Sequence, residues 1–355
     1  MAEIVLKRIN KQFEKRTIIE NLNLTIRDGS FTVLLGPSGC GKTTTLRMIA
    51  GLEKPDNGEL WIGDRCVNHV PPGERDVAMV FQNYALYPTM TVRENIEFGL
   101  INKKVPKRER QQLVEEIVET VGLQDYLNKK PNTLSGGQRQ RVALARAMIK
   151  KPKVFLMDEP LSNLDAKLRM HMRTELVELH KKLGTTFVYV THDQLEAMSM
   201  GEDIVVMNHG EIMQQGNPLQ VYDEPENAFT AQFIGTPPMN MIEKSRIAGL
   251  LPVNPHESAV YVGFRPEKVA LSSELADGVH IDGVIVTRQV FGAETVYQVQ
   301  TEFGLIFVRD FLKPRHTSSV VQLFVALSDL HFFDEQGRKM ERMGDVHALD
   351  EPVRG

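Results

Sequence analysis

The sequence predicts an α/β domain that carries a helical insertion and is followed by a smaller all-β domain. Three observations lead to this fold class. Short apolar runs alternate with segments of helical periodicity through the first 235 of the 355 residues. One stretch between two of these runs, about 84–150, is mostly helical in pattern. Beyond residue 243 the pattern changes to short alternating strands separated by Gly and Asp turns.

The bulk composition is that of a soluble globular protein with more than one domain. Hydrophobic residues make up 42% of the chain and charged residues 25%, which is an ordinary balance. The formal net charge of −4 provides no basic field, so we expect no nucleic-acid partner. Two cysteines, Cys40 and Cys66, argue against a disulfide framework and indicate a reducing compartment.

No segment has the pattern of a signal peptide or of a membrane helix. The start, MAEIVLKRIN, lacks the apolar core of a signal peptide. No apolar run approaches the roughly 20 residues that a membrane helix needs. We therefore expect any membrane contact to be made through another protein.

The first domain is predicted from five nearly continuous apolar runs. Strands covered on both faces have this pattern, as in a parallel sheet between helices. The runs predict strands at 31–36, 77–82, 154–158, 186–191 and 203–208. Helical periodicity predicts helices at 42–50, 108–121, 138–150 and 166–183. The insertion at about 84–150 is then a helical subdomain between two strands of the sheet.

The second domain begins after a linker. Paired prolines in FIGTPPMNMIE, residues 233–243, are typical of such a connection. The segments that follow read as short strands joined by turns, and they predict a small antiparallel barrel. We therefore expect domains at 1–235 and 236–355.

GPSGCGKT, residues 36–43, predicts a phosphate-binding loop because it follows a strand and opens a helix. Its glycines let successive N–H groups point inward, and the helix dipole favours an anion there. Lys42 would reach the β- and γ-phosphates, and Thr43 would offer a hydroxyl to Mg²⁺. A purely structural glycine-rich turn is disfavoured because all eight positions and both flanks fit. The loop predicts a nucleoside triphosphate site.

Asp158 and Glu159 follow the apolar run VFLM and differ in predicted role. A carboxylate at the end of a buried strand is costly unless it is paired or bound to metal, so Asp158 is a candidate Mg²⁺ ligand. Glu159 can accept a proton from an attacking water or orient it. An acidic turn cap is the alternative for this pair, and the phosphate loop weighs against it.

His192 and Gln82 close two other predicted strands. A lone histidine is most often structural. Ligands of open α/β sheets, however, bind at the carboxyl ends of the strands, so His192 is a candidate γ-phosphate contact. Gln82 lies at the same edge and precedes the helical insertion, into which it could carry information about the ligand.

The stretch TLSGGQRQR, residues 133–141, is a loop that turns into a helix and suggests a second anion site. Ser135 alone would be an ordinary helix N-cap. The two glycines after it cost helix stability and add nothing to that cap. We expect them to leave space for something that approaches the backbone closely.

These motifs together resemble the ATPase subunit of an ABC transporter. LSGGQ, GPSGCGKT, VFLMDEP, SNLD and THD are present in the family's arrangement. FQNYALYPTMTVRENI, EPLSNLDAKLR, THDQLEAM and FIGTPPMN are similar to importers of the maltose and glycerol-3-phosphate group. GFRPEKVAL, VFGAETVYQV and LHFFDEQGRKM resemble that group's regulatory barrel. The implied fold is a P-loop NTPase domain with a helical subdomain, followed by an all-β, OB-like (TOBE) regulatory barrel.

The resemblance implies roles for named residues, with ATP and Mg²⁺ as cofactors. Glu159 would be the catalytic base, His192 would steady the γ-phosphate, and Asp165 would couple two sites across a dimer. ATP would be bound by Phe13, Ile18, Gly36, Pro37, Ser38, Gly39, Cys40, Gly41, Lys42, Thr43, Thr44 and Gln82. The ATP of a second copy would be covered by Ser135, Gly136, Gly137 and Gln138. The metal would be held by Thr43, Gln82 and Asp158.

The same resemblance implies a complex. Two ATPase subunits, identical or paralogous, would serve two transmembrane permease subunits and an extracytoplasmic solute-binding protein. The chain would be peripheral, at the cytoplasmic face of the inner membrane, and the solute would be a carbohydrate or a glycerol-phosphate-like compound. A soluble ABC ATPase acting on nucleic acid is disfavoured because the chain has one cassette and no long coiled coil. A vestigial ATPase is disfavoured because Lys42, Asp158, Glu159 and His192 are all present.

We also expect the thiol of Cys40 to be reactive. It lies near Lys42 and a helix N-terminus, both of which lower the pKa of a thiol. Alkylation of Cys40 would then block nucleotide binding; the alternative is that Cys40 only fills space.

Overall fold

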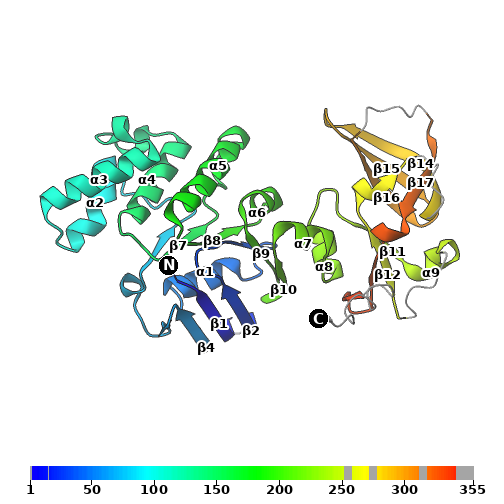
Figure 1. The fold of residues 1–355 in the computed structure, drawn as a ribbon, viewed down its shortest axis with the longest axis horizontal. Coiled ribbons are helices and arrows are strands. Elements are labelled where there is room, and N and C mark those ends of the chain that lie inside the picture. Colours follow the sequence, from blue (N-terminus) through cyan, green and yellow to red (C-terminus); the bar gives the residue numbers. More distant parts are fainter. Residues whose placement is uncertain (1, 15, 252–257, 272–277, 312–317, 341–355) are drawn as a thin grey trace, which may run out of the picture. The chain divides into compact units, whose positions relative to one another are not determined.

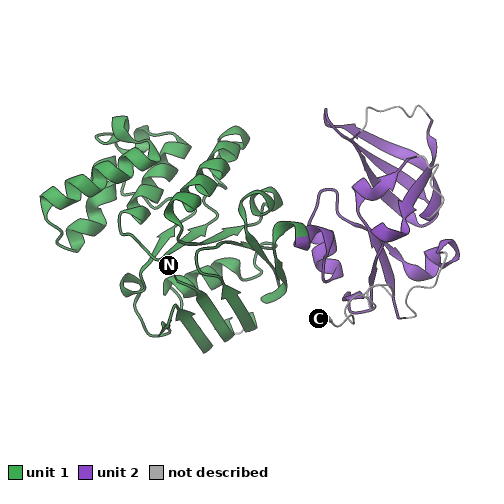
Figure 2. Cartoon of the chain, in the orientation of Figure 1, with its two compact units in different colours: residues 1–219 green, residues 220–355 purple. Residues whose placement is uncertain are grey.

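A computed structural model describes most of the chain as two compact units, residues 1–219 and 220–355 (Figure 2). The described residues are 2–14, 16–251, 258–271, 278–311 and 318–340. The end of the expected second domain, residues 341–355, lies outside them. The expected domain boundary, between 235 and 236, lies further along the chain than the boundary between the units and stays a prediction.

The centre of unit 1 is a six-stranded sheet with the strand order β10-β9-β3-β8-β7-β6. Its first five strands in sequence pair in parallel, and β10 is antiparallel to β9. The strands are β3 (Phe31–Leu35), β6 (Val77–Val80), β7 (Val154–Asp158), β8 (Thr186–Thr191), β9 (Asp203–Asn208) and β10 (Glu211–Gly216). All residues of β3 and β8 are buried, which confirms the prediction made from continuous apolar runs. The carboxyl ends of the parallel strands therefore meet at one edge.

Helices cover both faces of this sheet (Figure 1). On one face α1 (Lys42–Ala50) packs between the sheet and the N-terminal strands, with Leu46 and Ile49 fully buried. On the other face lie α5 (Ala166–Leu183) and α6 (Gln194–Met200). His180 of α5 is edge-on to Phe31 of β3, with ring centroids 5.3 Å apart.

A second, antiparallel sheet at the N-terminus was not among the predicted elements. Its order is β2-β1-β4-β5, and its strands are β1 (Ile4–Phe13), β2 (Arg16–Ile26), β4 (Asn57–Ile62) and β5 (Arg65–Cys66). The apolar side chains of this sheet share one core with α1 and with the central sheet. The sheet brings Phe13, the last residue of β1, close to the phosphate loop.

The insertion between β6 and β7 is helical, as predicted. It comprises α2 (Val92–Asn102), α3 (Lys107–Val121) and α4 (Gly136–Met148), and it has its own core, which includes Ile96, Val118 and Val142. The helix expected at 138–150 begins two residues earlier, at Gly136, because Ser135 caps it. Both glycines of the 133–141 stretch are thus helical.

Unit 2 is mainly β-structure. One sheet has the order β11-β12-β18-β19 and another β13-β17-β14-β15-β16, all paired antiparallel. Their strands are β11 (Asn240–Glu243), β12 (Tyr261–Phe264), β13 (Val269–Ala270), β14 (Gly278–Val290), β15 (Thr295–Thr301), β16 (Gly304–Asp310), β17 (Val320–Ala326), β18 (His331–Phe333) and β19 (Lys339–Met340). The short helices are α7 (Pro218–Asp223), which begins in unit 1, α8 (Ala228–Phe233) and α9 (Lys244–Ile247).

One apolar core joins the two sheets and includes Phe264, Ile281, Val299 and Leu323. The predicted all-β second domain is confirmed. None of the helices in the described part of the chain is both long and apolar enough to cross a bilayer.

Candidate active site

The phosphate loop joins β3 to α1 and adopts a conformation that requires its glycines. Gly39 and Gly41 have φ values of 80° and 106°, a region that L residues rarely adopt. A Cβ on Gly36 would collide with the carbonyl oxygen of Met207. The loop therefore lies against β9 and leads directly into the N-terminus of α1, where backbone N–H groups lack helical partners.

Lys42 is the first residue of α1 and is 5% exposed. Its Nζ donates to the carbonyl oxygens of Gly36, at 2.7 Å, and Pro37, at 2.8 Å. The ammonium group is thus held inside the loop by neutral acceptors. Anionic phosphate oxygens can replace those acceptors with stronger, charge-assisted bonds.

Cys40 differs from the expectation. Its side chain is buried at 4% exposure, and burial raises the pKa of its thiol although Lys42 acts in the opposite direction. Desolvation of the thiolate outweighs the nearby cation. The expected lowering of the Cys40 pKa is therefore wrong. The burial of Cys40 supports the alternative that its side chain only fills space in the loop.

Asp158, at the end of β7, accepts a hydrogen bond from the Thr43 hydroxyl at 2.9 Å. Burial raises the pKa of Asp158, the Thr43 bond opposes that shift, and the neighbouring Glu159 adds to it. A half-buried carboxylate with a single hydroxyl donor suits a hard divalent cation, which prefers oxygen ligands. Thr43 and Asp158 therefore fit Mg²⁺, with phosphate oxygens and water completing its shell.

Glu159 lies where three strand ends meet. Its φ of 44° is unusual for a glutamate, and its N–H donates to the Val190 carbonyl oxygen at 3.0 Å. Its carboxylate contacts Nδ1 of His192 at 3.2 Å and accepts from Nε2 of Gln82 at 3.3 Å. Strained backbone is found mainly at functional sites. Two predicted residues, Gln82 and His192, thus converge on the carboxylate of a third, Glu159.

Gln82 is also held from the loop after β7. Its side-chain Nε2 lies 3.3 Å from the Ser162 hydroxyl, and its backbone carbonyl oxygen accepts from Nδ2 of Asn163 at 2.9 Å. The amide therefore faces Glu159 and Ser162, while its assignment as a metal ligand stays a prediction. Ser162 and Asn163 were not singled out from the sequence as contacts of Gln82.

A cavity of about 310 Å³ lies over the phosphate loop. Its lining includes most of the predicted ATP-binding residues: Phe13, Ile18, Ser38, Gly39, Gly41, Lys42, Thr43 and Thr44. It also includes Glu159, the predicted catalytic base. Arg16 also lines it and was missed from the sequence. Arg16 and Ile18 lie two apart on β2, so their side chains share a face, and this spacing is the signal that could have found Arg16.

Ser135–Gln138 are absent from the described residues that line this cavity. Ser135 and Gln138 form a reciprocal capping box: the Ser135 N–H donates to Gln138 Oε1 at 2.9 Å, and the Gln138 N–H donates to Ser135 Oγ at 3.3 Å. A Cβ on Gly136 would lie 2.7 Å from Leu164 Cδ2, and one on Gly137 3.0 Å from Leu168 Cδ1. The close approach expected at the two glycines is thus made, within this chain, by leucines at the start of α5.

Asp165 is the N-cap of α5, and its Oδ1 accepts from the Leu168 N–H at 2.9 Å. The structure thus gives Asp165 a local role at the start of that helix. Its coupling of two sites stays a prediction.

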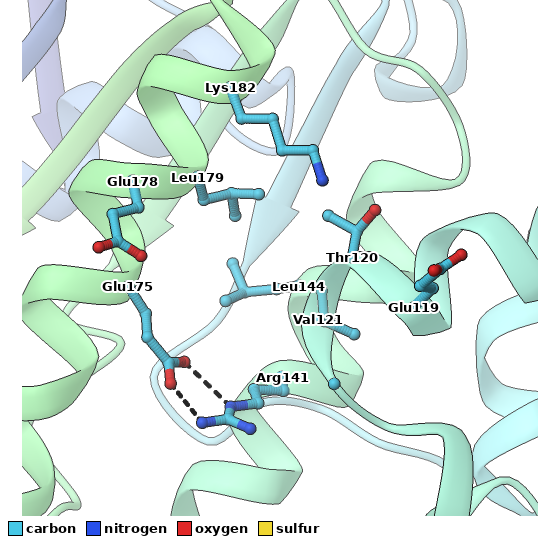
Figure 3. A pocket seen from close by; sticks show the side chains of 10 residues that line it. Glu119, Thr120, Val121, Arg141, Leu144, Glu175, Glu178, Leu179 and Lys182 are labelled. Atoms are coloured by element: carbon cyan, nitrogen blue, oxygen red, sulfur yellow. Dashed lines mark hydrogen bonds and ion pairs between the residues drawn. The ribbon is translucent and has the colours of Figure 1, made fainter.

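A larger cavity, about 430 Å³, lies between α3, α4 and α5 (Figure 3). The Arg141 Nε donates to Glu175 at 3.0 Å across one side of it. Charged side chains of both signs and a few apolar ones line the rest, including Lys182 and Leu144. Its lining contains no phosphate-loop residue, and we assign it no part in the chemistry described above.

Known proteins match both parts of the chain. A family model described as ABC transporter matches residues 19–162, and one described as TOBE domain matches residues 262–323. The sn-glycerol-3-phosphate import ATP-binding protein UgpC of Brucella abortus is 44% identical over 349 residues, which cover 96% of this chain and 99% of that protein. The trehalose/maltose import ATP-binding protein MalK of Thermococcus litoralis is 58% identical over 249 residues, covering 68% and 67%.

Solved structures agree with this match. A dimeric ATP-binding cassette in a post-hydrolysis state, bound to ADP and Pi, is 35% identical with a TM-score of 0.55 and covers 61% of this chain and 98% of that one. CbiO1 of Clostridium perfringens, part of an ABC transporter complex, is 28% identical with a TM-score of 0.59, covering 62% and 90%. With near-complete coverage of a relative at 44% identity, this chain belongs to the ABC transporter family, among the ATP-binding ATPases of importers.

Proposed function

We propose that this ABC importer ATPase hydrolyses ATP with the residues gathered over its phosphate loop, and that two copies close around the nucleotide to drive import. The observation that carries the proposal is the convergence of Gln82 and His192 on Glu159, which lines one cavity together with Lys42 and Thr43. These residues come from four different segments of the chain, which a purely structural role would not require.

Within the site we propose separate roles in phosphate binding, adenine stacking, metal binding and proton transfer. Lys42 and the loop N–H groups bind the β- and γ-phosphates, and the exposed ring of Phe13, 41% accessible, stacks on the adenine with Ile18 beside it. Mg²⁺, held by Thr43, Asp158 and Gln82, would neutralise phosphate charge. Glu159 accepts the proton of the attacking water, and His192 donates a hydrogen bond to the γ-phosphate.

The 135–138 segment is proposed to serve the ATP of a second copy. Its absence from the described lining of the cavity supports this, as does the dimeric state of a related cassette. The capping box leaves the first N–H groups of α4 available to an anion. Asp165 would contact the facing subunit, so that closure completes both sites.

The names of the relatives support a proposal for the class of solute. UgpC and MalK are named for import of sn-glycerol-3-phosphate and of trehalose and maltose, so we propose a carbohydrate or a glycerol-phosphate-like solute. Two permease subunits and an extracytoplasmic solute-binding protein would complete the complex, with this chain peripheral at the cytoplasmic face of the inner membrane. We propose that residues 1–235 form the ATPase domain and 236–355 the regulatory barrel.

The direct test is Glu159→Gln in the full chain. We expect ATP binding to be retained and steady hydrolysis to fall by about 10²- to 10⁴-fold, the usual size of a general-base contribution. Phosphate release and equilibrium binding of a fluorescent ATP analogue measure the two effects separately. Glu115→Gln, on the exposed side of α3, controls for loss of a carboxylate. Full turnover by Glu159→Gln would exclude Glu159 as the base.

A further inference from the structure

Arg169, in the second turn of α5, bridges two loops of the site. Its Nη2 donates to the carbonyl oxygen of Leu164 at 3.0 Å. On its other side, Nη1 lies 3.5 Å from Asp193 Oδ2 and Nε lies 3.9 Å from Glu196 Oε1. One guanidinium thus lies between the loop that ends at Asp165 and the segment that follows His192.

The position of Arg169 is fixed by the start of its helix. The Arg169 N–H donates to the Asp165 carbonyl oxygen at 2.8 Å, so its side chain rises from the turn that Asp165 caps. Leu164, whose carbonyl oxygen it also binds, directly precedes that cap. Any displacement of the Leu164–Asp165 backbone therefore moves the guanidinium with it.

On the side of α6, Arg169 approaches a buried polar network around His192. Glu196, 3% exposed, accepts hydrogen bonds from the Tyr189 hydroxyl at 2.8 Å and the Thr191 hydroxyl at 2.7 Å. Thr191 Oγ1 in turn accepts from the Asp193 N–H at 3.0 Å. His192 lies between these anchored neighbours with its own side chain 57% exposed. The network therefore fixes the backbone of His192 and leaves its imidazole free to reach Glu159.

The contact from Arg169 to this network is incomplete. Its Nε is buried and has no hydrogen-bond partner among the residues that the structure describes, and 3.9 Å to Glu196 is too long for such a bond. A buried donor without a partner is unfavourable. A small movement of α5 towards α6 would supply the missing bond, so the arrangement suits a contact that closes in a second state of the molecule.

We propose that Arg169 is a positioning residue that holds His192 in register with the Leu164–Asp165 loop. The inference rests on the role of His192 given under Proposed function. Since Asp165 is there assigned to the facing subunit, Arg169 makes the position of His192 depend on closure of the dimer. It contacts neither ATP nor the reacting atoms and acts only through His192.

The first test compares ATP turnover of the full chain with Arg169→Met, Arg169→Lys and Arg173→Met. We expect Arg169→Met to lower kcat by about 10- to 100-fold, as losses of supporting contacts around an active site commonly do, with KM for ATP changed less than about twofold. Arg169→Lys keeps the charge but cannot bridge both loops, so its kcat should be intermediate. Arg173 lies one turn further along α5 and forms no ion pair with a described residue, so Arg173→Met should match wild type.

The second test repeats Arg169→Met in a His192→Ala chain, with phosphate release followed from labelled ATP over long incubations. If Arg169 acts through His192, the double variant keeps the kcat of His192→Ala, because residues that act as a unit are not additive. A full additional loss in the double variant would overturn the inference and leave the role of His192 intact. An unchanged kcat in His192→Ala alone would overturn that role, and the inference with it. Where Arg169→Met does not fold, Arg169→Lys takes its place in both backgrounds.

Discussion

Two carboxyl groups beside the site, the half-buried Asp158 and the buried Glu196, have pKa values that are raised chiefly by desolvation. They differ in what surrounds them. Asp158 has one hydroxyl donor, from Thr43, whereas Glu196 accepts two, from Tyr189 and Thr191. Asp158 therefore keeps acceptor capacity for a cation. In Glu196 both hydroxyl bonds are made by Oε2, which holds the residues next to His192, while Oε1 lies 3.9 Å from Arg169 Nε.

The raised pKa of Glu196 makes stability depend on pH in a defined direction. The folded state binds the Glu196 proton more tightly than the unfolded state, so its contribution is most favourable below the ordinary glutamate pKa and is lost as pH rises through the raised value. We expect the stability of wild type relative to Glu196→Gln to fall across this window. Urea midpoints measured at several pH values provide the test, with Glu115→Gln as baseline. If wild type instead became more stable relative to Glu196→Gln as pH rises, the raised pKa of Glu196 would be contradicted.

At the residue scale, motif residues could be predicted from the sequence and their supporting contacts could not. Lys42, Thr43, Asp158, Glu159 and His192 stand at strand ends or in a glycine loop, and both features are visible in the chain. Arg169 is one of two arginines on a charged helix, and only its tertiary contacts with Leu164, Asp193 and Glu196 distinguish it. Cys40 was misjudged because its burial depends on packing that no local pattern reports.

Among the elements, α1 connects the phosphate loop to the core, and its far end depends on one buried side chain. Arg75, 4% exposed, donates through Nη1 to the carbonyl oxygens of Met48 at 2.8 Å and Ile49 at 3.1 Å. Its Nε donates to Val70 at 2.8 Å. The Met48 carbonyl also accepts from the N–H of Gly51, the C-cap of α1, at 3.1 Å, whereas carbonyls in the last turn of a helix generally lack helical partners. A cation at this end of α1 also complements the helix dipole.

Arg75→Met should therefore destabilise unit 1 by about 2–3 kcal/mol, the cost of leaving buried carbonyls unpaired. Chemical denaturation followed by a probe in unit 1, such as fluorescence of the single Trp61, measures the change. Arg27→Met, an exposed arginine that follows β2, is the matched control. Equal stability of the two variants would show that Arg75 does not support α1.

At the element scale, strands buried on both faces were predicted and the N-terminal sheet was not. Continuous apolar runs mark β7, β8 and β9 with the bounds that the structure gives. In β1 the alternation is interrupted: Leu6 and Ile9 are both buried, the register shifts between them, and Arg8 has a φ of 51°. A bulge of this kind breaks the two-residue period on which the prediction depends.

For the whole molecule, we expect one chain to bind ATP without forming a complete hydrolysis site. Ser135→Arg places a bulky charge at the start of α4, away from the described lining of the chain's own cavity. We expect ATP binding by the single chain to be unchanged and hydrolysis to fall to background, because closure of the dimer is blocked. Ser328→Arg, in unit 2, controls for the added charge. Loss of ATP binding by the Ser135→Arg monomer would mean that Ser135 serves its own chain.

An engineered disulfide between the phosphate loop, residues 36–43, and the 135–138 segment would show whether the two segments meet between two copies of the chain. Ser38→Cys and Ser135→Cys, both at exposed positions, would be introduced into one chain that also carries Glu159→Gln, with Cys40 and Cys66 replaced by serine. Oxidation with and without ATP, followed by non-reducing electrophoresis, shows which cysteines meet. If the 135–138 segment covers the ATP of a second copy, a covalent dimer forms, and it forms only with ATP. A disulfide within one monomer, independent of protein concentration, would contradict it.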